Sequence, residues 1–324
     1  MPCSNGLALH RHQSPPLRGD FFCQAHAIEH PDRYNQAMSQ RPDTHTIDPS
    51  EFAAVFGPRD AMGHKGTFGS AGIVGGAPGM RGAVVLAARS ALKAGCGRVY
   101  VAVPQPTEHT SLDLGQPEVM WRDIDGLTGL SAQITAWAVG CGLGQSPESL
   151  RCLKSVFQHR CKRPLVIDAD ALNALARRDV SPTWGEGPVV LTPHPTEAAR
   201  LLATETAQVQ ADRLGAAREL ARQFNAWVVL KGPHSIVSSP TGQCQINPTG
   251  NVALATAGTG DVLTGAITSL LAQGFATDVA IAAALWLHGA AADLWVKQMG
   301  GPVGMTAGEL IDLMRQLRNQ PRSL

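Results

Sequence analysis

Hydrophobic and polar positions follow two alternating patterns along most of this chain. From about residue 70, short apolar runs alternate with segments whose apolar positions recur every three or four residues. Runs that are apolar on both faces predict buried strands, whereas the longer spacing predicts helices with one buried face. The predicted strands are 71–75, 98–103, 136–139, 165–168, 188–192 and 227–231, and the predicted helices are 82–94, 147–159, 195–203 and 211–224.

The alternation of buried strands with helices favours an α/β fold with a mainly parallel sheet covered by helices on each side. After residue 234 the pattern changes. Two short runs at 235–238 and 243–246 flank Ser239-Pro-Thr-Gly, which predicts a hairpin, and three helices are expected at 261–273, 278–297 and 306–317. Thr277 and Thr306 are the expected N-caps. The second of these helices is so apolar that we expect it in the interior or at a subunit interface.

The first 50 residues differ from the rest of the chain. They hold five of the eleven histidines and several prolines, and they show no sustained apolar periodicity. We therefore predict an extension, disordered or loosely attached, over residues 1–50. With no internal repeat in the sequence, a single domain is expected over residues 51–324.

Composition narrows the classes of partner. Lys and Arg total 27 against 26 Asp and Glu, which gives a formal net charge of +1 and no reason to expect a nucleic acid or an anionic membrane surface. No run of about 18 consecutive apolar residues occurs, so we predict no membrane-spanning helix. The N-terminus does not have the pattern of a signal peptide, which favours the cytoplasm.

Seven cysteines are spread along the chain without a C-x-x-C pair. The nearest approach to a metal motif is Cys152, His159 and Cys161, and a fourth ligand at a usual spacing is missing. We therefore interpret the cysteines as free thiols in a reducing compartment.

Glycine clusters follow two predicted strands, at 75–83 and at 140–144. Ligands of open α/β sheets bind at the ends of strands, so both clusters are candidate ligand loops. Neither cluster is a dinucleotide fingerprint. After Gly140 and Gly142 the third glycine would have to stand at position 145, which is Gln145, and no P-loop is present. A tight structural turn is the alternative for each cluster.

The strongest local motif is Ala257-Gly-Thr-Gly-Asp261, which opens a predicted helix. Glycines let the backbone approach a ligand closely, and the helix directs free N–H groups and its positive dipole end toward an anion. A carboxylate beside such an anion site is well placed to act as a general base on a substrate hydroxyl. The alternative is that Asp261 only caps the helix.

Two other strand ends carry candidate chemistry. Lys231 follows a strand and precedes Gly232, where its ammonium can reach a phosphate; a surface lysine is the alternative. His194 stands between Pro193 and Pro195, which restrict the backbone around it. A structural histidine is equally compatible with that pattern.

Together, these segments resemble the ribokinase-like superfamily, a three-layer α/β/α sandwich, and more closely its ADP-dependent NAD(P)H-hydrate dehydratase family. The resemblance spans about residues 60–295. The matching segments are H-K-G-T-F-G (64–69), G-G (75–76), G-A (82–83), G-L-G (142–144), D-A-D-A-L-N (168–173), T-P-H-P-T-E (192–197), K-G (231–232) and A-G-T-G-D-V-L-T-G (257–265).

The resemblance implies a repair enzyme that dehydrates the hydrated forms of NADH and NADPH while ADP is cleaved to AMP and phosphate, with Mg²⁺. By the same resemblance, Asp261 is the base and also contacts the hydrate. The other implied hydrate ligands are Ala83, Gly142, Gly144 and His194. The implied nucleotide site comprises Lys231, Gly232, Pro233, His234, Ser235, Gly258, Thr259 and Gly260.

The resemblance further implies a homotetramer that works with a separate NAD(P)H-hydrate epimerase. Many relatives carry an N-terminal epimerase domain of about 200 residues, and since about 60 residues precede the matching region here, epimerase activity is not expected of this chain.

Two alternative functions remain open. A small-molecule kinase of the same fold, acting on a vitamin precursor, would share the G-x-G-D turn, and a nucleotide sensor would bind without turnover.

Overall fold

The computed structural model describes residues 43–105, 113–181 and 183–320. The strands are β1 (Thr44–Thr46), β2 (Ser70–Val74), β3 (Arg98–Ala102), β4 (Val119–Arg122), β5 (Ala136–Val139), β6 (Leu165–Ile167), β7 (Val189–Leu191), β8 (Trp227–Leu230), β9 (Ile236–Ser238) and β10 (Cys244–Ile246). The helices are η1 (Pro49–Phe56), α2 (Arg81–Lys93), α3 (Ile124–Thr128), α4 (Pro147–His159), α5 (Ala169–Ala176), α6 (Pro195–Leu202), α7 (Thr206–Ala211), α8 (Arg213–Phe224), η3 (Val252–Leu254), α9 (Thr259–Ala272), α10 (Thr277–Met299) and α11 (Ala307–Asn319).

All the described strands form one sheet in the order β1-β10-β9-β8-β7-β6-β5-β2-β3-β4. Neighbours pair in parallel except at β8–β9 and β9–β10, and the second of these antiparallel pairs is the predicted hairpin. Since β2 pairs with both β3 and β5, the chain reverses its direction of progress across the sheet between β2 and β5. Such a switch point opens a crevice at the carboxyl ends of the strands, where ligands of α/β folds bind.

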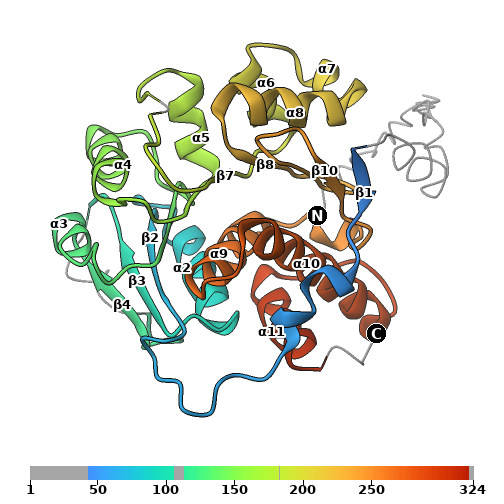
Figure 1. Cartoon of the computed structure of the whole chain (residues 1–324), viewed down its shortest axis with the longest axis horizontal. Coiled ribbons are helices and arrows are strands. Elements are labelled where there is room, and N and C mark those ends of the chain that lie inside the picture. Colours follow the sequence, from blue (N-terminus) through green and yellow to red (C-terminus); the bar gives the residue numbers. More distant parts are fainter. Residues whose placement is uncertain (1–42, 106–112, 182, 321–324) are drawn as a thin grey trace, which may run out of the picture.

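Helices cover both faces of the sheet, as the apolar pattern predicts (Figure 1). Helices α3, α4, α5, α6 and α8 pack on one face, and α2, α9, α10 and α11 pack on the other. Side-chain size differs between the two faces of the central strand β5. Ala136 and Ala138 point toward α9, while Trp137 is fully buried on the opposite face. The small side chains allow α9 to lie close against the middle of the sheet.

The expected elements are confirmed, with most bounds displaced by one or two residues. The predicted helix 211–224 is α8, which begins at Arg213 because the Asp212 side chain accepts a hydrogen bond from the N–H of Gly215 and caps it. Ala211 ends the preceding helix α7, which was not predicted. Thr306 is confirmed as an N-cap with a capping box, whereas Thr277 is wrong, since Ala276 occupies that position. Strands β1 and β4 were not predicted.

Strand β1 lies within the segment 1–50 for which an extension is predicted. It pairs in parallel with β10, so Thr44 lies opposite Cys244 at one edge of the sheet. The rest of that segment, residues 1–42, lies outside the described residues.

Helix α10 is apolar on nearly every side. By length and mean hydropathy (1.6 over its best window) it is apolar enough to cross a membrane, yet 83% of that window is buried inside the fold. Trp286 on this helix packs against Phe52 and Phe56 of η1. Of the two expected locations, the interior is therefore confirmed, and α10 is a core helix of this domain.

Helices α2 and α9 approach each other closely, which sets the position of the start of α9. The Ser90 hydroxyl donates to the carbonyl of Val262, and Ser269 donates to the carbonyl of Ala91. At Gly265 a Cβ atom would lie 2.1 Å from the carbonyl oxygen of Ala87, so only glycine permits this spacing.

We expect Gly265→Ala to destabilise the protein, although alanine is the better helix former. The added methyl group meets backbone that cannot move without separating the two helices, and overpacking of this kind costs about 1–3 kcal/mol. Thermal unfolding should show a fall in Tm of several degrees. Gly301→Ala is the matched control, because a Cβ atom there meets nothing within 4 Å. An unchanged Tm for Gly265→Ala would show that α2 and α9 can separate at little cost.

Candidate functional site

The candidate residues meet at the carboxyl edge of the sheet, where five neighbouring strands end. Glycine permits the loops after these strands to touch. A Cβ atom at Gly75 would lie 2.2 Å from the carbonyl oxygen of Cys141, and one at Gly140 would lie 1.8 Å from that of Asp168. Both glycine clusters are thus tight structural turns, and they also bring the ends of β2, β5 and β6 to one place.

The G-T-G-D motif forms the first turn of α9. Gly258 is the N-cap with a φ of +91°, a conformation that glycine adopts without strain. Asp261 is therefore not the cap, and its carboxylate is available for another role. The first N–H groups of the helix have no acceptor within the helix, which makes this turn an anion site.

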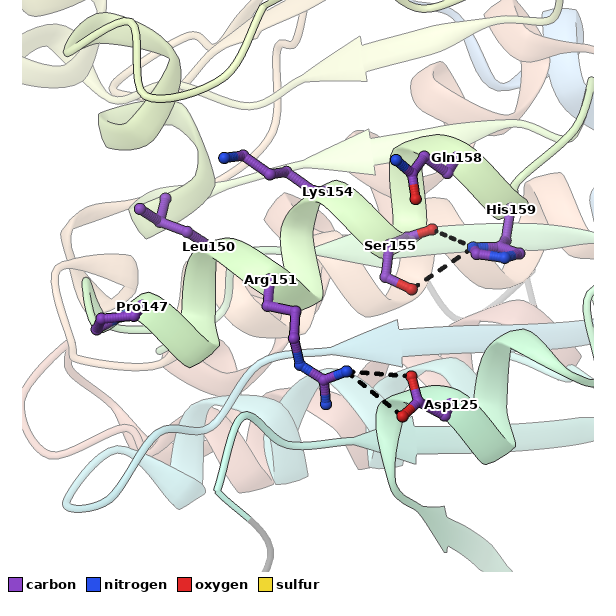
Figure 2. A pocket seen from close by; sticks show the side chains of 8 residues that line it. All are labelled: Asp125, Pro147, Leu150, Arg151, Lys154, Ser155, Gln158 and His159. Atoms are coloured by element: carbon purple, nitrogen blue, oxygen red, sulfur yellow. Dashed lines mark hydrogen bonds and ion pairs between the residues drawn. The ribbon is translucent and has the colours of Figure 1, made fainter.

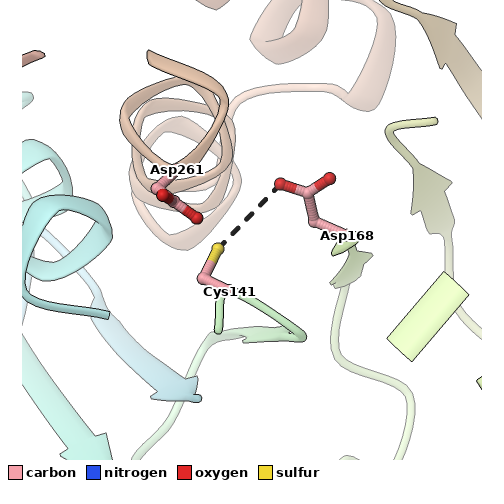
Figure 3. A group of neighbouring side chains, drawn as sticks. All are labelled: Cys141, Asp168 and Asp261. Atoms are coloured by element: carbon pink, nitrogen blue, oxygen red, sulfur yellow. Dashed lines mark hydrogen bonds between the residues drawn. The ribbon is translucent and has the colours of Figure 1, made fainter. Parts of the chain in front are cut away.

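Asp261 faces a buried carboxylate and a thiol. Ligand atoms of Asp261, Asp168 and Cys141 lie within 4.8 Å of one another, and the Cys141 thiol lies 4.0 Å from Asp168 Oδ2 (Figure 3). Burial, followed by the negative charge of Asp168, raises the pKa of Asp261 to about 6. A carboxyl group with a pKa near neutrality is both ionised at physiological pH and basic enough to accept a proton.

Lys231 is the cation of the site. Its Nζ donates to Asp168 Oδ1 at 2.7 Å and lies 4.0 Å from Glu197 Oε2. A Cβ atom on Gly260 would be 3.4 Å from the same Nζ, so the ammonium lies directly beside the anion-binding turn. The attraction of the two carboxylates outweighs the cost of burial and raises the pKa of Lys231, which therefore stays charged.

His194 is the N-cap of α6, held by a capping box. Its Nδ1 accepts from the N–H groups of Thr196 and Glu197, so the ring proton lies on Nε2, 3.4 Å from Glu197 Oε1. Burial and the charge of Lys231 lower the pKa of His194, which favours a neutral ring. His194 therefore has a structural role as the cap of α6, and the Nε2 edge of its ring remains half-exposed beside Glu197.

Of the five expected hydrate ligands, Ala83, Gly142 and Gly144 lie together. A Cβ atom on Gly142 would be 3.0 Å from that of Ala83, and the N–H of Gly144, one turn further, donates to Asp170 at 2.8 Å. His194 lies two strands away across the sheet, after β7, and connects to this group through Glu197, Lys231 and Asp168.

A cavity of about 390 Å³ lies beside Lys231, which forms part of its lining. Seven of the eight expected nucleotide residues line it; Gly258 does not, because it packs against Leu86. Four polar lining residues were missed by sequence reasoning: Asn247, Thr249, Asn251 and His288. His288 donates from Nε2 to the carbonyl of Thr259, and complete burial lowers its pKa to about 4. It thus holds the first residue of α9 as a neutral ring.

The loop after β8 has an unusual backbone. Gly232 and His234 have φ values of +141° and +50°. The guanidinium of Arg213, at the start of α8, donates to the carbonyls of Leu230, Lys231 and Pro233 and so holds the loop in this shape. Sequence reasoning missed Arg213, because nothing in its local pattern distinguishes it from a surface residue of a helix.

A larger hollow of about 600 Å³ lies on the outer face of α4 (Figure 2). It holds the Arg151–Asp125 ion pair and His159, whose Nδ1 donates to the Ser155 carbonyl, and these groups are exposed. None of the expected site residues lines it.

Cys152 and Cys161, expected to be free, are free here, and no metal cluster forms around them in the described ranges.

The segment His64–Gly69 lies away from Asp261, at the amino edge of the sheet. Cβ atoms at Gly69 and Gly97 would lie 2.0 Å from the carbonyl oxygens of Ala272 and Lys65. Gly69 of this segment therefore allows close packing against the C-terminal end of α9.

Comparisons with known proteins agree on one family. The profile of the NAD(P)H-hydrate dehydratase family matches residues 71–316. The ADP-dependent (S)-NAD(P)H-hydrate dehydratase of Neisseria meningitidis is 46% identical over 271 residues, which cover 83% of this chain and 91% of that protein. A bifunctional NAD(P)H-hydrate repair enzyme of Moorella thermoacetica is 44% identical over 79% of this chain and 50% of its own length.

Solved structures agree with the fold. The ADP/ATP-dependent NAD(P)H-hydrate dehydratase of Bacillus subtilis, co-crystallised with ATP/Mg²⁺, superposes with a TM-score of 0.72 at 33% identity, covering 84% of this chain and 96% of that one. A ribokinase-like superfamily protein of Enterococcus faecalis superposes with a TM-score of 0.78 at 25% identity, covering 86% and 96%. The expected ribokinase-like α/β/α fold is thus confirmed.

The raised pKa of Asp261 predicts that this residue destabilises the fold at neutral pH. Its pKa is about 6 in the folded chain against a usual 3.8, so the protonated form is favoured by folding. That contribution is complete below pH 4 and is lost as the pH rises through 6, a difference of roughly 2–3 kcal/mol. Asp261→Asn should therefore unfold at a higher denaturant midpoint than the wild type at pH 8, and the gain should shrink toward pH 4.

Glu186→Gln is the control for this measurement, since the Glu186 side chain is 73% exposed. Its unfolding midpoint should follow that of the wild type at both pH values. Equal stability of Asp261→Asn and wild type at pH 8 would show that the Asp261 carboxylate is well solvated.

Proposed function

This chain belongs to the NAD(P)H-hydrate dehydratase family, and from that premise we propose how its site performs the reaction. The protein is a hydro-lyase that uses ADP to dehydrate (S)-NADH hydrate and (S)-NADPH hydrate to NADH and NADPH. One observation supports the residue roles above all others. A carboxylate with a raised pKa stands in the first turn of a helix whose N-terminus binds anions, and a buried ammonium lies beside that turn.

Asp261 is the general base of the proposed mechanism. Its carboxylate removes the proton from the ring hydroxyl of the hydrate, and the hydroxyl oxygen attacks the terminal phosphorus of ADP, which releases AMP. The ring then carries a phosphate ester in place of the hydroxyl. Electrons from the ring nitrogen expel phosphate, a far better leaving group than hydroxide, and loss of a ring proton re-forms the double bond. The oxygen of the added water thus leaves within phosphate.

The cavity beside Lys231 is the proposed ADP site. Apolar walls suited to the adenine ring of ADP come from Val252, Leu254 and Leu285. Lys231 and Gly260 lie at the end of the cavity that adjoins Asp261. N–H groups of the turn from Gly258 to Asp261 stabilise the charge that develops on the transferred phosphoryl group. On the opposite side of Asp261, we assign Ala83, Gly142, Gly144 and His194 to the hydrate.

The described side chains do not form a Mg²⁺ cage. Mg²⁺ requires octahedral oxygen ligands, and the acidic group at the site includes the Cys141 thiol, whose pKa is raised well above its usual value by burial. Both oxygens of Asp168 are already engaged by Lys231 and Thr264. We therefore propose that Mg²⁺ accompanies the nucleotide and is held mainly by phosphate oxygens and water.

Three expectations about the wider context remain proposals. We propose a homotetramer, to be tested by light scattering, and a cytoplasmic location, which suits the free thiols of the described cysteines. We also propose a functional link to a separate NAD(P)H-hydrate epimerase. That link is supported by relatives of about twice the matched length that are bifunctional repair enzymes.

The assay for this function combines the protein with chemically prepared NADH hydrate, ADP and Mg²⁺. Absorbance of the reduced nicotinamide should recover, with one AMP and one phosphate released per NADH formed. Asp261→Asn should lower kcat by about 10²- to 10⁴-fold, the usual contribution of a general base, with the fold intact.

Other outcomes would point elsewhere. A stable phosphorylated product would indicate a kinase, and nucleotide binding without any turnover would indicate a sensor. Near-normal kcat in Asp261→Asn would remove Asp261 from the role of base. The wild-type rate should also fall at acid pH with an apparent pKa near 6, because the protonated carboxyl cannot accept the hydroxyl proton.

A further inference from the structure

The carboxylate of Asp168 lies at the centre of the site but has no role in the mechanism above. It follows β6, is 1% exposed, and its two oxygens bind different parts of the molecule. Oδ1 accepts from Lys231 Nζ at 2.7 Å, and Oδ2 accepts from the Thr264 hydroxyl at 2.8 Å. Thr264 stands one helical turn after Asp261 on α9, so one carboxylate connects the ammonium to the helix that carries the base.

The backbone around Asp168 is strained in a way that favours this placement. Ala169 has a φ of +45°, a left-handed conformation that is unfavourable for alanine, and its N–H donates to Asp168 Oδ1 at 2.9 Å. Gly140 leaves room for the Asp168 carbonyl, which a Cβ atom would approach to 1.8 Å. Strain of this kind persists where the surrounding structure enforces it, and it gathers at functional sites.

We infer that Asp168 is a positioning residue that fixes Lys231 and the first turns of α9 relative to each other, so that base and phosphoryl donor meet in line. The inference rests on the proposed function. Without the Thr264 bond, α9 loses its contact with the end of β6 one turn after Asp261. Without the Asp168 charge, the remaining ion-pair partner of the Lys231 ammonium among the described residues is Glu197, whose Oε2 is 4.0 Å away. Misplacement of reacting groups by about 1 Å can cost on the order of 100-fold in rate.

Asp168 also acts on Asp261 through its charge. The groups that face Asp261 are Asp168 after β6, Lys231 after β8, Cys141 after β5 and Asp170 on α5. Of these, the Asp168 charge makes the largest contribution after burial, and it raises the pKa of Asp261. Removal of this charge should therefore move the acid limb of the rate to lower pH, a shift that a purely structural role would not produce.

Three variants separate geometry from charge. Asp168→Asn keeps the shape and removes the charge. Thr264→Val removes the hydroxyl and keeps the charge, and Thr264→Ser restores the hydroxyl. Asp179→Asn is the matched control, because this carboxylate pairs with exposed Arg177, away from the site, and the change should leave all readouts unchanged.

The measurements are kcat and KM for ADP across pH, Mg·ADP affinity by calorimetry, and Tm as a check of folding. For Asp168→Asn we expect kcat about 10- to 100-fold lower, a higher KM for ADP, weaker ADP binding and an acid limb at lower pH. For Thr264→Val we expect a lower kcat with the acid limb unmoved, and Thr264→Ser should recover most of that loss.

Folded Asp168→Asn with wild-type kcat, KM and acid limb would overturn the inference. If Asp168→Asn does not fold, Thr264→Val decides, and a wild-type kcat there overturns it equally. Failure of the proposed function is a separate result: the wild type would bind Mg·ADP without converting the hydrate. In that case an ADP affinity unchanged by Asp168→Asn would still count against Asp168 as the group that holds Lys231.

Discussion

The ion pair between Asp168 and Lys231 determines the arrangement of this site. It joins the ends of β6 and β8, which are separated in the sheet by β7, and the second Asp168 oxygen extends the connection to Thr264 on α9. A buried ion pair contributes little to stability, because desolvation offsets the attraction of the charges. The effect of this ion pair is geometric, because the Asp168 carboxylate fixes the Lys231 ammonium and the helix that carries Asp261 relative to each other.

The sheet makes this arrangement possible because its parallel strands deliver their loops to one edge. Small side chains on the central strands allow α9 to approach, and glycines at the strand ends allow the loops to touch. The same close packing extends to the other end of α9, where Gly69 meets the carbonyl of Ala272. Two segments at opposite edges of the sheet thus contact one helix, at its start, which carries Asp261, and at its packed end.

Much of this fold follows from local sequence signals. Buried apolar runs located the six central strands, and the glycine pair before Asp261 located the anion-binding turn. The partners of that turn carry no local signal, because sheet order brings them together. Asp168 is 96 residues from Thr264 and 63 from Lys231, while His288 reaches Thr259 from 29 residues away. Arg213 and Asn247 likewise acquire their roles only when α8 and the hairpin are placed beside the loop that follows β8.

The charges at the site also constrain how an anionic nucleotide binds. Asp168, Asp261 and Glu197 surround one ammonium, so the ionised cluster carries more negative than positive charge. Lys231 alone cannot offset this excess and also attract a diphosphate. The remaining attraction must come from the N–H groups of α9 and from a cation bound to the phosphates. Burial and the negative charge of Asp168 also keep the pKa of Asp261 raised, as a general base requires.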